Sequence, residues 1–116
     1  YALCMNCHNS GMLNKNINGS ETAFRDDRLV NGKVVSKNLH WFHVANAPDA
    51  AHKIRGFSCF ACHDPHASNQ PHGIRDGWSM SENNGFVVNI EFSPKASGGQ
   101  CTKSCHDLRS YERSGK

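Results

Sequence analysis

The feature that most constrains this chain is a set of three cysteine pairs, each followed directly by a histidine. The pairs with their histidines are Cys4, Cys7 and His8; Cys59, Cys62 and His63; and Cys101, Cys105 and His106. Two residues separate the cysteines of the first two pairs, and three residues separate those of the third. Histidine makes up only 8 of the 116 residues, so composition does not explain a histidine after every pair.

This pattern favours covalent attachment of haem over the other uses of paired cysteines. Two thiols at this spacing can add across the two vinyl groups of one haem, and the adjacent imidazole becomes an iron ligand. Structural zinc gives no reason for a histidine after every second cysteine, and neither does a secreted disulfide framework. A thioredoxin-like dithiol needs one motif on a βαβ unit, not three motifs.

We therefore expect three haem c groups. Their thioether bonds would be made by Cys4, Cys7, Cys59, Cys62, Cys101 and Cys105, and their proximal iron ligands would be His8, His63 and His106. At the third pair, the longer spacing is interpreted as a variant with one extra residue looped out. The alternative at that pair is a disulfide followed by an unrelated histidine.

Five further histidines could supply the sixth iron ligands: His40, His43, His52, His66 and His72. His40 and His43 are three residues apart, so a helical turn would place them together and let them reach two neighbouring haems. His66 follows His63 by three residues across Pro65, which stiffens the loop, so it should reach a different haem from the one that His63 holds. His52 and His72 lie in polar loops, where surface roles are expected. We predict bis-histidine ligation with His40, His43 and His66 as distal ligands.

The order of these motifs resembles a known family. The run CxxCH, NLHxxHV, CxxCHDPHAS and GGxCxxxCHD, from Cys4 to His106, is similar to multihaem c-type cytochromes of anaerobic respiratory electron transfer, in particular those with doubled CxxCH motifs. The resemblance implies axial roles for His40, His43 and His66. Two departures are the lack of a histidine after the terminal motif, in CHDLRSYERSGK, and the additional His52 and His72.

Composition predicts a domain that side-chain packing alone does not hold together. The chain is 37% hydrophobic with a mean hydropathy of −0.64 and lacks long amphipathic runs. We expect residues 1–116 to form a single triheme domain or fragment of irregular loops, short helices and a minor β-hairpin, with a core of three haems. Because the chain opens at YALCMNCH without an initiator Met or a signal peptide, we expect it to be processed or cut.

Local patterns predict a few elements. Asn31-Gly32 between β-branched residues indicates a type I′ hairpin in residues 29–35, and residues 85–93 alternate as a strand does. Short helices are expected at His40 and His43 and after Cys101, and loops at SENNG and KASGGQ. The aromatic residues expected to pack against porphyrin are Trp41, Phe42, Phe57, Phe60 and Phe86.

These features predict electron transfer through closely spaced, low-potential haems, and not an enzyme. Two alternatives remain: a multihaem reductase of a small oxyanion, with the His106 haem as the open site, and a structural module of a cytochrome filament. We expect redox proteins or other haem domains of the same chain as partners, with oligomers or filaments as further assemblies. The formal charge of +3 is scattered and does not favour nucleic acid, and no stretch approaches the roughly 18 apolar residues of a membrane span. Since c-type haem is attached outside the cytoplasm, a periplasmic or extracellular location follows.

Overall fold

The computed structural model of the chain describes residues 2–16, 22–46, 59–64, 68–75, 78–79, 87–88, 90–101 and 107–113. Its helical segments are short: α1 (Ala2–Met5), the 3-10 turns η1 (Ser10–Leu13), η3 (Cys59–Ala61) and η4 (Pro71–Gly73), and the π-helical turn η2 (Trp41–Ala45). Its strands are β1 (Arg25–Val30), β2 (Lys33–Asn38), β3 (Trp78–Ser79), β4 (Val87–Val88), β5 (Phe92–Lys95), β6 (Gly98–Cys101) and β7 (Arg109–Glu112).

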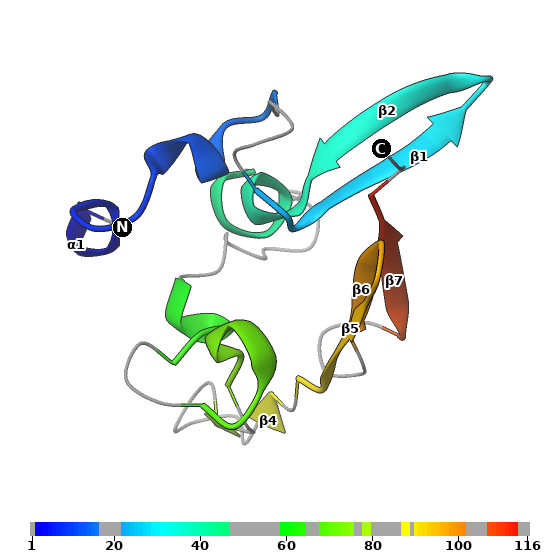
Figure 1. Cartoon of the computed structure of the whole chain (residues 1–116). Coiled ribbons are helices and arrows are strands. Elements are labelled where there is room, and N and C mark those ends of the chain that lie inside the picture. Colours follow the sequence, from blue (N-terminus) through cyan, green and yellow to red (C-terminus); the bar gives the residue numbers. More distant parts are fainter. Residues whose placement is uncertain are drawn as a thin grey trace, which may run out of the picture.

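Strands β1 and β2 form a projecting antiparallel hairpin (Figure 1). Their register runs from Arg25 opposite Asn38 to Val30 opposite Lys33. The two connecting residues, Asn31 and Gly32, have φ angles of 52° and 75°. Positive φ at both central residues is what a type I′ turn requires, because its twist matches that of the flanking strands. The hairpin prediction is therefore confirmed.

A three-stranded antiparallel sheet in the order β5-β6-β7 follows. The observed strands correct two sequence-based predictions. Residues 85–93 are not one strand: β4 pairs with β3, Ile90 and Glu91 lie outside any strand, and β5 begins at Phe92. The segment KASGGQ is not a loop but ends β5, turns and enters β6. Residues 102–106, where a helix was predicted directly after Cys101, and the loop predicted at SENNG lie outside the described residues. The described residues that follow, 107–113, contain strand β7 and no helix.

The glycines of β6 explain why KASGGQ was predicted as a loop and is part of a sheet. Gly98 and Gly99 are buried against β7, and a Cβ on Gly98 would overlap the Tyr111 carbonyl oxygen. A Cβ on Gly99 would lie 2.7 Å from the Phe92 ring and 2.8 Å from the Tyr111 hydroxyl. Glycine is therefore required here for close approach of neighbouring strands, which sequence alone cannot distinguish from a loop.

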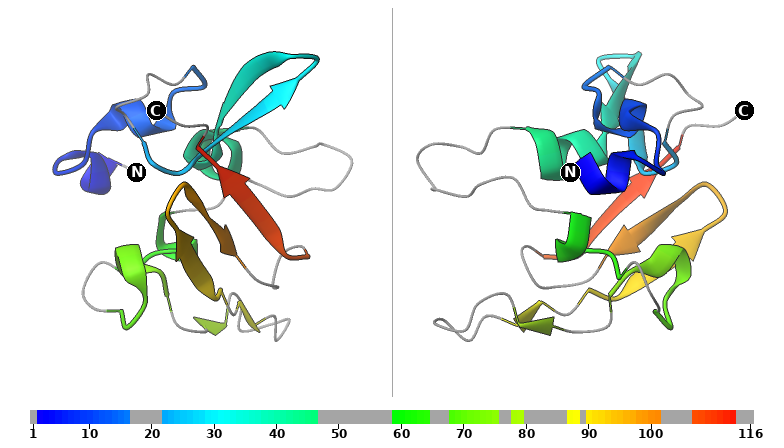
Figure 2. Two further views of the ribbon diagram at one scale, coloured as in Figure 1. Left: turned by 45° about the vertical axis from the view of Figure 1, so that its right-hand side comes forward. Right: turned by 90° about the vertical axis from the view of Figure 1, so that its left-hand side faces the viewer.

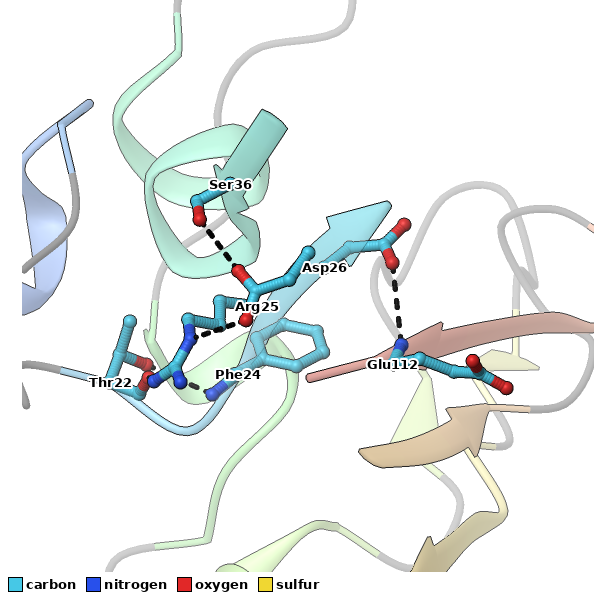
Figure 3. Close-up of polar contacts among 7 residues, drawn as sticks. Thr22, Phe24, Arg25, Asp26, Ser36 and Glu112 are labelled. Atoms are coloured by element: carbon cyan, nitrogen blue, oxygen red, sulfur yellow. Dashed lines mark hydrogen bonds and ion pairs between the residues drawn. The ribbon is translucent and has the colours of Figure 1, made fainter. Parts of the chain in front are cut away.

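Side chains of the hairpin connect it to this sheet. Figure 2 shows β7 running from the sheet to the base of the hairpin in both views. Asp26 Oδ1 accepts a hydrogen bond from the Glu112 N–H at 3.3 Å (Figure 3), and Arg28 donates to the Ser110 carbonyl at 2.7 Å. These contacts join residues more than 80 positions apart in the sequence. Strand β7 therefore holds β1 in place.

The apolar core of the described residues is very small. Only Ala61 and Tyr111 are buried hydrophobic residues there, whereas eight large hydrophobic residues are exposed: Leu3, Leu29, Val30, Val34, Val35, Phe42, Phe60 and Leu108. The small core agrees with the expectation that side-chain packing alone does not hold the chain together.

Among the predicted porphyrin-packing residues, Phe42 and Phe60 are exposed. Lys37 lies over the Phe42 ring with its Nζ 3.6 Å from the ring centre, and Lys15 lies 5.4 Å from the Trp41 ring centre. Phe57 and Phe86 lie outside the described residues. Within the described part of the chain, no helix is both long enough and apolar enough to cross a membrane.

Candidate functional site

The first two cysteine motifs share one backbone geometry. The Cys4 carbonyl accepts hydrogen bonds from the N–H groups of Cys7 at 3.2 Å and His8 at 3.0 Å. The Cys59 carbonyl accepts from Cys62 at 3.2 Å and His63 at 2.9 Å. Each motif therefore closes a single helical turn, in which residues three apart lie on one face. This turn explains the spacing, since it gives the two thiols a common side and places the histidine directly after them.

Two of the described cysteines, Cys4 and Cys59, lie close together. Burial and the neighbouring Cys4 thiol, which lies within hydrogen-bonding reach, raise the pKa of Cys59. The first cysteines of the first and second motifs therefore face each other. Cys101 lies at the end of β6, where burial raises its pKa, while its predicted partners Cys105 and His106 lie outside the described residues.

His63 is oriented by a main-chain carbonyl. Its Nδ1 lies 3.0 Å from the His72 carbonyl oxygen. Because a carbonyl only accepts, Nδ1 must carry the ring proton, and Nε2 keeps the lone pair that binds a metal. Antiparallel contacts fix this carbonyl: the Asp64 N–H donates to Gly73 O at 2.8 Å, and the Arg75 N–H donates to Cys62 O at 2.9 Å.

His72 itself adopts an uncommon backbone conformation, with φ of 60°. Its side chain is exposed, and its ring centre lies 5.6 Å from that of Phe92. The left-handed conformation is costly for a residue other than glycine, and here it directs the His72 carbonyl toward His63. Sequence reasoning missed this role, because it depends on the main chain and not on the imidazole.

His40 and His43 lie on the predicted helical turn: His43 belongs to the π-helical η2, and His40 is the N-cap of η2 with α-helical φ and ψ angles. The Asn46 N–H donates to Trp41 O at 2.6 Å, five residues earlier. His43 Nδ1 lies 2.7 Å from the Leu39 carbonyl oxygen, so Nδ1 carries the ring proton. His40 Nδ1 lies 2.8 Å from the Thr22 hydroxyl. Single π-type turns often occur at functional sites.

Asn38 holds this turn in place, although nothing in its sequence context identified it. It is 1% exposed. Its side-chain oxygen accepts from the Trp41 N–H at 3.2 Å, as an N-cap does. Its side-chain nitrogen donates to the carbonyls of Met12 and Asn14, both at 2.7 Å. Asn38 thus joins the segment after the first cysteine motif to the turn that carries His40 and His43.

Phe24 packs against both histidines of the turn. Its ring centre lies 5.1 Å from that of His40, 5.8 Å from that of His43 and 5.1 Å from that of Tyr111. The ring centres of His40 and His63 are 6.3 Å apart, with 26° between the ring planes. The fold therefore brings a predicted distal ligand to a predicted proximal ligand from a different part of the chain.

The environment of His40 keeps its imidazole neutral. Burial, followed by the nearby rings of His63 and His43, lowers the pKa of His40 from 6.5 to about 4. A neutral imidazole is the metal-binding form. Among the described residues, no three His, Cys, Asp or Glu side chains converge on a common metal position. A pair of imidazoles matches the needs of a haem iron, because the porphyrin supplies the equatorial nitrogens.

The remaining predicted ligands are either exposed or outside the described residues. His8 is exposed and follows α1. His66, His52, Cys105 and His106 lie outside the described residues, so their predicted roles stay predictions. Thr22 and Phe24 belong to the site but were not predicted, since they stand in a segment without cysteine or histidine and approach His40 only in the folded chain.

Residues 52–80 match the family model of the doubled CXXCH motif. The matched segment contains the second motif, residues 59–63, together with the loop that orients His63. Comparison with curated proteins gave no match, and comparison with solved structures gave none either. The match supports a relationship to multihaem c-type cytochromes, and the CXXCH motifs indicate covalently bound haem c.

Proposed function

We propose that this chain is an electron-transfer cytochrome whose c-type haems have two histidine ligands each. The observation that carries the proposal is the pairing of His40 with His63. Both imidazoles have Nδ1 engaged in a hydrogen bond, so in each ring Nε2 is the atom available to iron. When bound, haem supplies a reversible one-electron change at its iron.

The two rings stack with 26° between their planes, and the distance between their centres is that of two imidazoles that share one iron. Metal–imidazole bonds are about 2 Å long, so the ring centres of two imidazoles on opposite sides of one metal lie roughly 6 Å apart. The His40 and His63 centres are 6.3 Å apart. We assign His63 as the proximal ligand and His40 as the distal ligand of the haem attached to Cys59 and Cys62.

The remaining histidines extend this arrangement to neighbouring haems. His43 shares the turn with His40, and its Leu39-bonded ring would serve the haem of an adjacent motif. The proximity of Cys4 to Cys59 supports close attachment of the first two haems. We propose three haems within residues 1–116, the third on Cys101 and Cys105, with His66 completing the distal set.

The chain's own residues would hold His40 neutral and fix the orientation of the imidazoles, and neither task makes or breaks a substrate bond. Bis-histidine ligation with partial exposure favours low reduction potentials. Electron donors and acceptors would be redox proteins or other haem domains. C-type cytochromes are usually periplasmic or extracellular, and that is the location we propose.

Replacing His40 tests the proposal. His40→Ala leaves all thioethers and proximal histidines in place, so the haem content should not change. One iron should become high-spin in the ferric protein and bind CO when reduced. His72→Asn is the matched control, because asparagine tolerates positive φ but has no imidazole, and it should stay low-spin. A fully low-spin His40→Ala protein would refute the ligand assignment, and CO binding by the unaltered protein would favour the reductase alternative.

A further inference from the structure

The three oriented histidines of the site differ in what their Nδ1 atoms contact. His43 and His63 donate to main-chain carbonyls, those of Leu39 and His72. His40 instead meets a side-chain hydroxyl, Thr22 Oγ1, at 2.8 Å. The Nδ1 partner of His40 therefore differs in kind from those of His43 and His63.

Thr22 is held rigidly for this contact. The residue is 8% exposed, and its Oγ1 also accepts from the Phe24 N–H at 3.1 Å. Arg25 Nη1 donates to the Thr22 carbonyl at 3.1 Å, while Arg25 Nε donates to Asp27 Oδ2 at 3.0 Å. Figure 3 shows Thr22, Phe24 and Arg25 in this arrangement at the start of β1. The hydroxyl therefore has a fixed position beside the His40 ring.

The partner of Nδ1 affects the electrons that Nε2 can give to a metal. A strong acceptor draws the Nδ1 proton toward itself and makes the ring a better donor at Nε2. A hydroxyl oxygen has two lone pairs, and the Phe24 N–H already occupies one at Thr22. When His40 binds iron through Nε2, its Nδ1 carries the ring proton, so the Thr22 hydroxyl accepts from Nδ1 as well as from the Phe24 N–H. An acceptor shared in this way supports His40 less strongly than the Leu39 carbonyl supports His43.

We propose that Thr22 is a positioning residue that sets the reduction potential of the haem ligated by His40. This inference rests on the proposed function, because it requires His40 to bind iron. Loss of the hydroxyl removes the acceptor from Nδ1, so His40 gives less electron density to the iron and the ferric state loses stabilisation. The potential of that one haem then rises, while the others keep theirs.

The test compares Thr22→Val, which keeps the shape and loses the hydroxyl, with Thr22→Ser, which keeps the hydroxyl. Thr22→Ala is a second variant without a hydroxyl, which avoids dependence on how the valine packs. Each holoprotein is titrated potentiometrically while its low-spin spectrum is followed. We expect one midpoint potential to shift upward in Thr22→Val and Thr22→Ala, an unchanged low-spin spectrum, and potentials close to those of the unaltered protein in Thr22→Ser.

Several results would overturn the inference. The inference fails if the potentials are unchanged in both variants without the hydroxyl, or if every haem shifts equally. It also fails if Thr22→Ser does not retain the original potential. A high-spin iron in any of the variants would show that Thr22 keeps His40 on the iron and does not tune its potential. Failure of the proposed function is recognised separately, since His40→Ala would then leave every iron low-spin.

Discussion

Replacing Asn38 should destabilise the fold more than any surface change, because its side chain connects three segments. Asn38→Ala removes two hydrogen bonds to the carbonyls of Met12 and Asn14 and one from the Trp41 N–H. A typical hydrogen bond contributes about 1 kcal/mol net, and buried groups left without partners cost more. We therefore expect the free energy of unfolding to fall by about 3 kcal/mol.

Urea denaturation of the holoprotein, followed by circular dichroism, measures this change. Asn38→Asp should be at least as harmful as Asn38→Ala, because it places a carboxylate oxygen against two carbonyl oxygens where an NH₂ group donated before. Asn16→Ala is the matched control at an exposed asparagine and should stay within about 0.5 kcal/mol of the unaltered protein. A similarly small effect of Asn38→Ala would refute the reasoning.

Two further predictions concern His72 and His40. His72→Gly should raise the free energy of unfolding by up to about 1 kcal/mol, since it relieves the left-handed strain at φ 60°, and every iron should stay low-spin. His72→Val should lower the free energy of unfolding. Thermal denaturation and ferric spectra of both variants measure these effects. A high-spin iron in His72→Gly would instead identify His72 as an axial ligand. Because the folded-state pKa of His40, about 4, lies below the unfolded value of 6.5, the unfolded chain binds the proton more readily. Stability should therefore be retained above about pH 6.5 and fall as the pH is lowered toward 4; iron ligation also keeps the ring neutral, so the direction is the same. Urea titrations across this range should show a steeper fall than in His40→Gln, and identical profiles would contradict the argument.

The features that sequence predicted correctly are those set by neighbouring residues. The turn that carries His40 and His43 involves contacts three to five residues apart, and the Asn31-Gly32 hairpin depends on the two residues at its tip. In these places the local pattern and the local structure are governed by the same interactions. Such elements can be identified in a single sequence.

The features that sequence missed depend on distant contacts. Thr22 reaches His40 across 18 residues, and the role of Gly99 is apparent only when Phe92 and Tyr111 are seen on either side of it. The function of His72 lies in a carbonyl, which every residue has, so its identity carried no signal. Polar partners of this kind become recognisable only when the fold brings them to a ligand.

The central claim is covalent haem, and intact mass under denaturing conditions tests it most directly. We expect the 12.8 kDa chain to carry three haems of about 0.6 kDa each that survive acid and organic solvent, because thioether bonds hold them. A mass with two haems would contradict attachment at Cys101 and Cys105. A mass equal to the bare polypeptide would contradict the whole account.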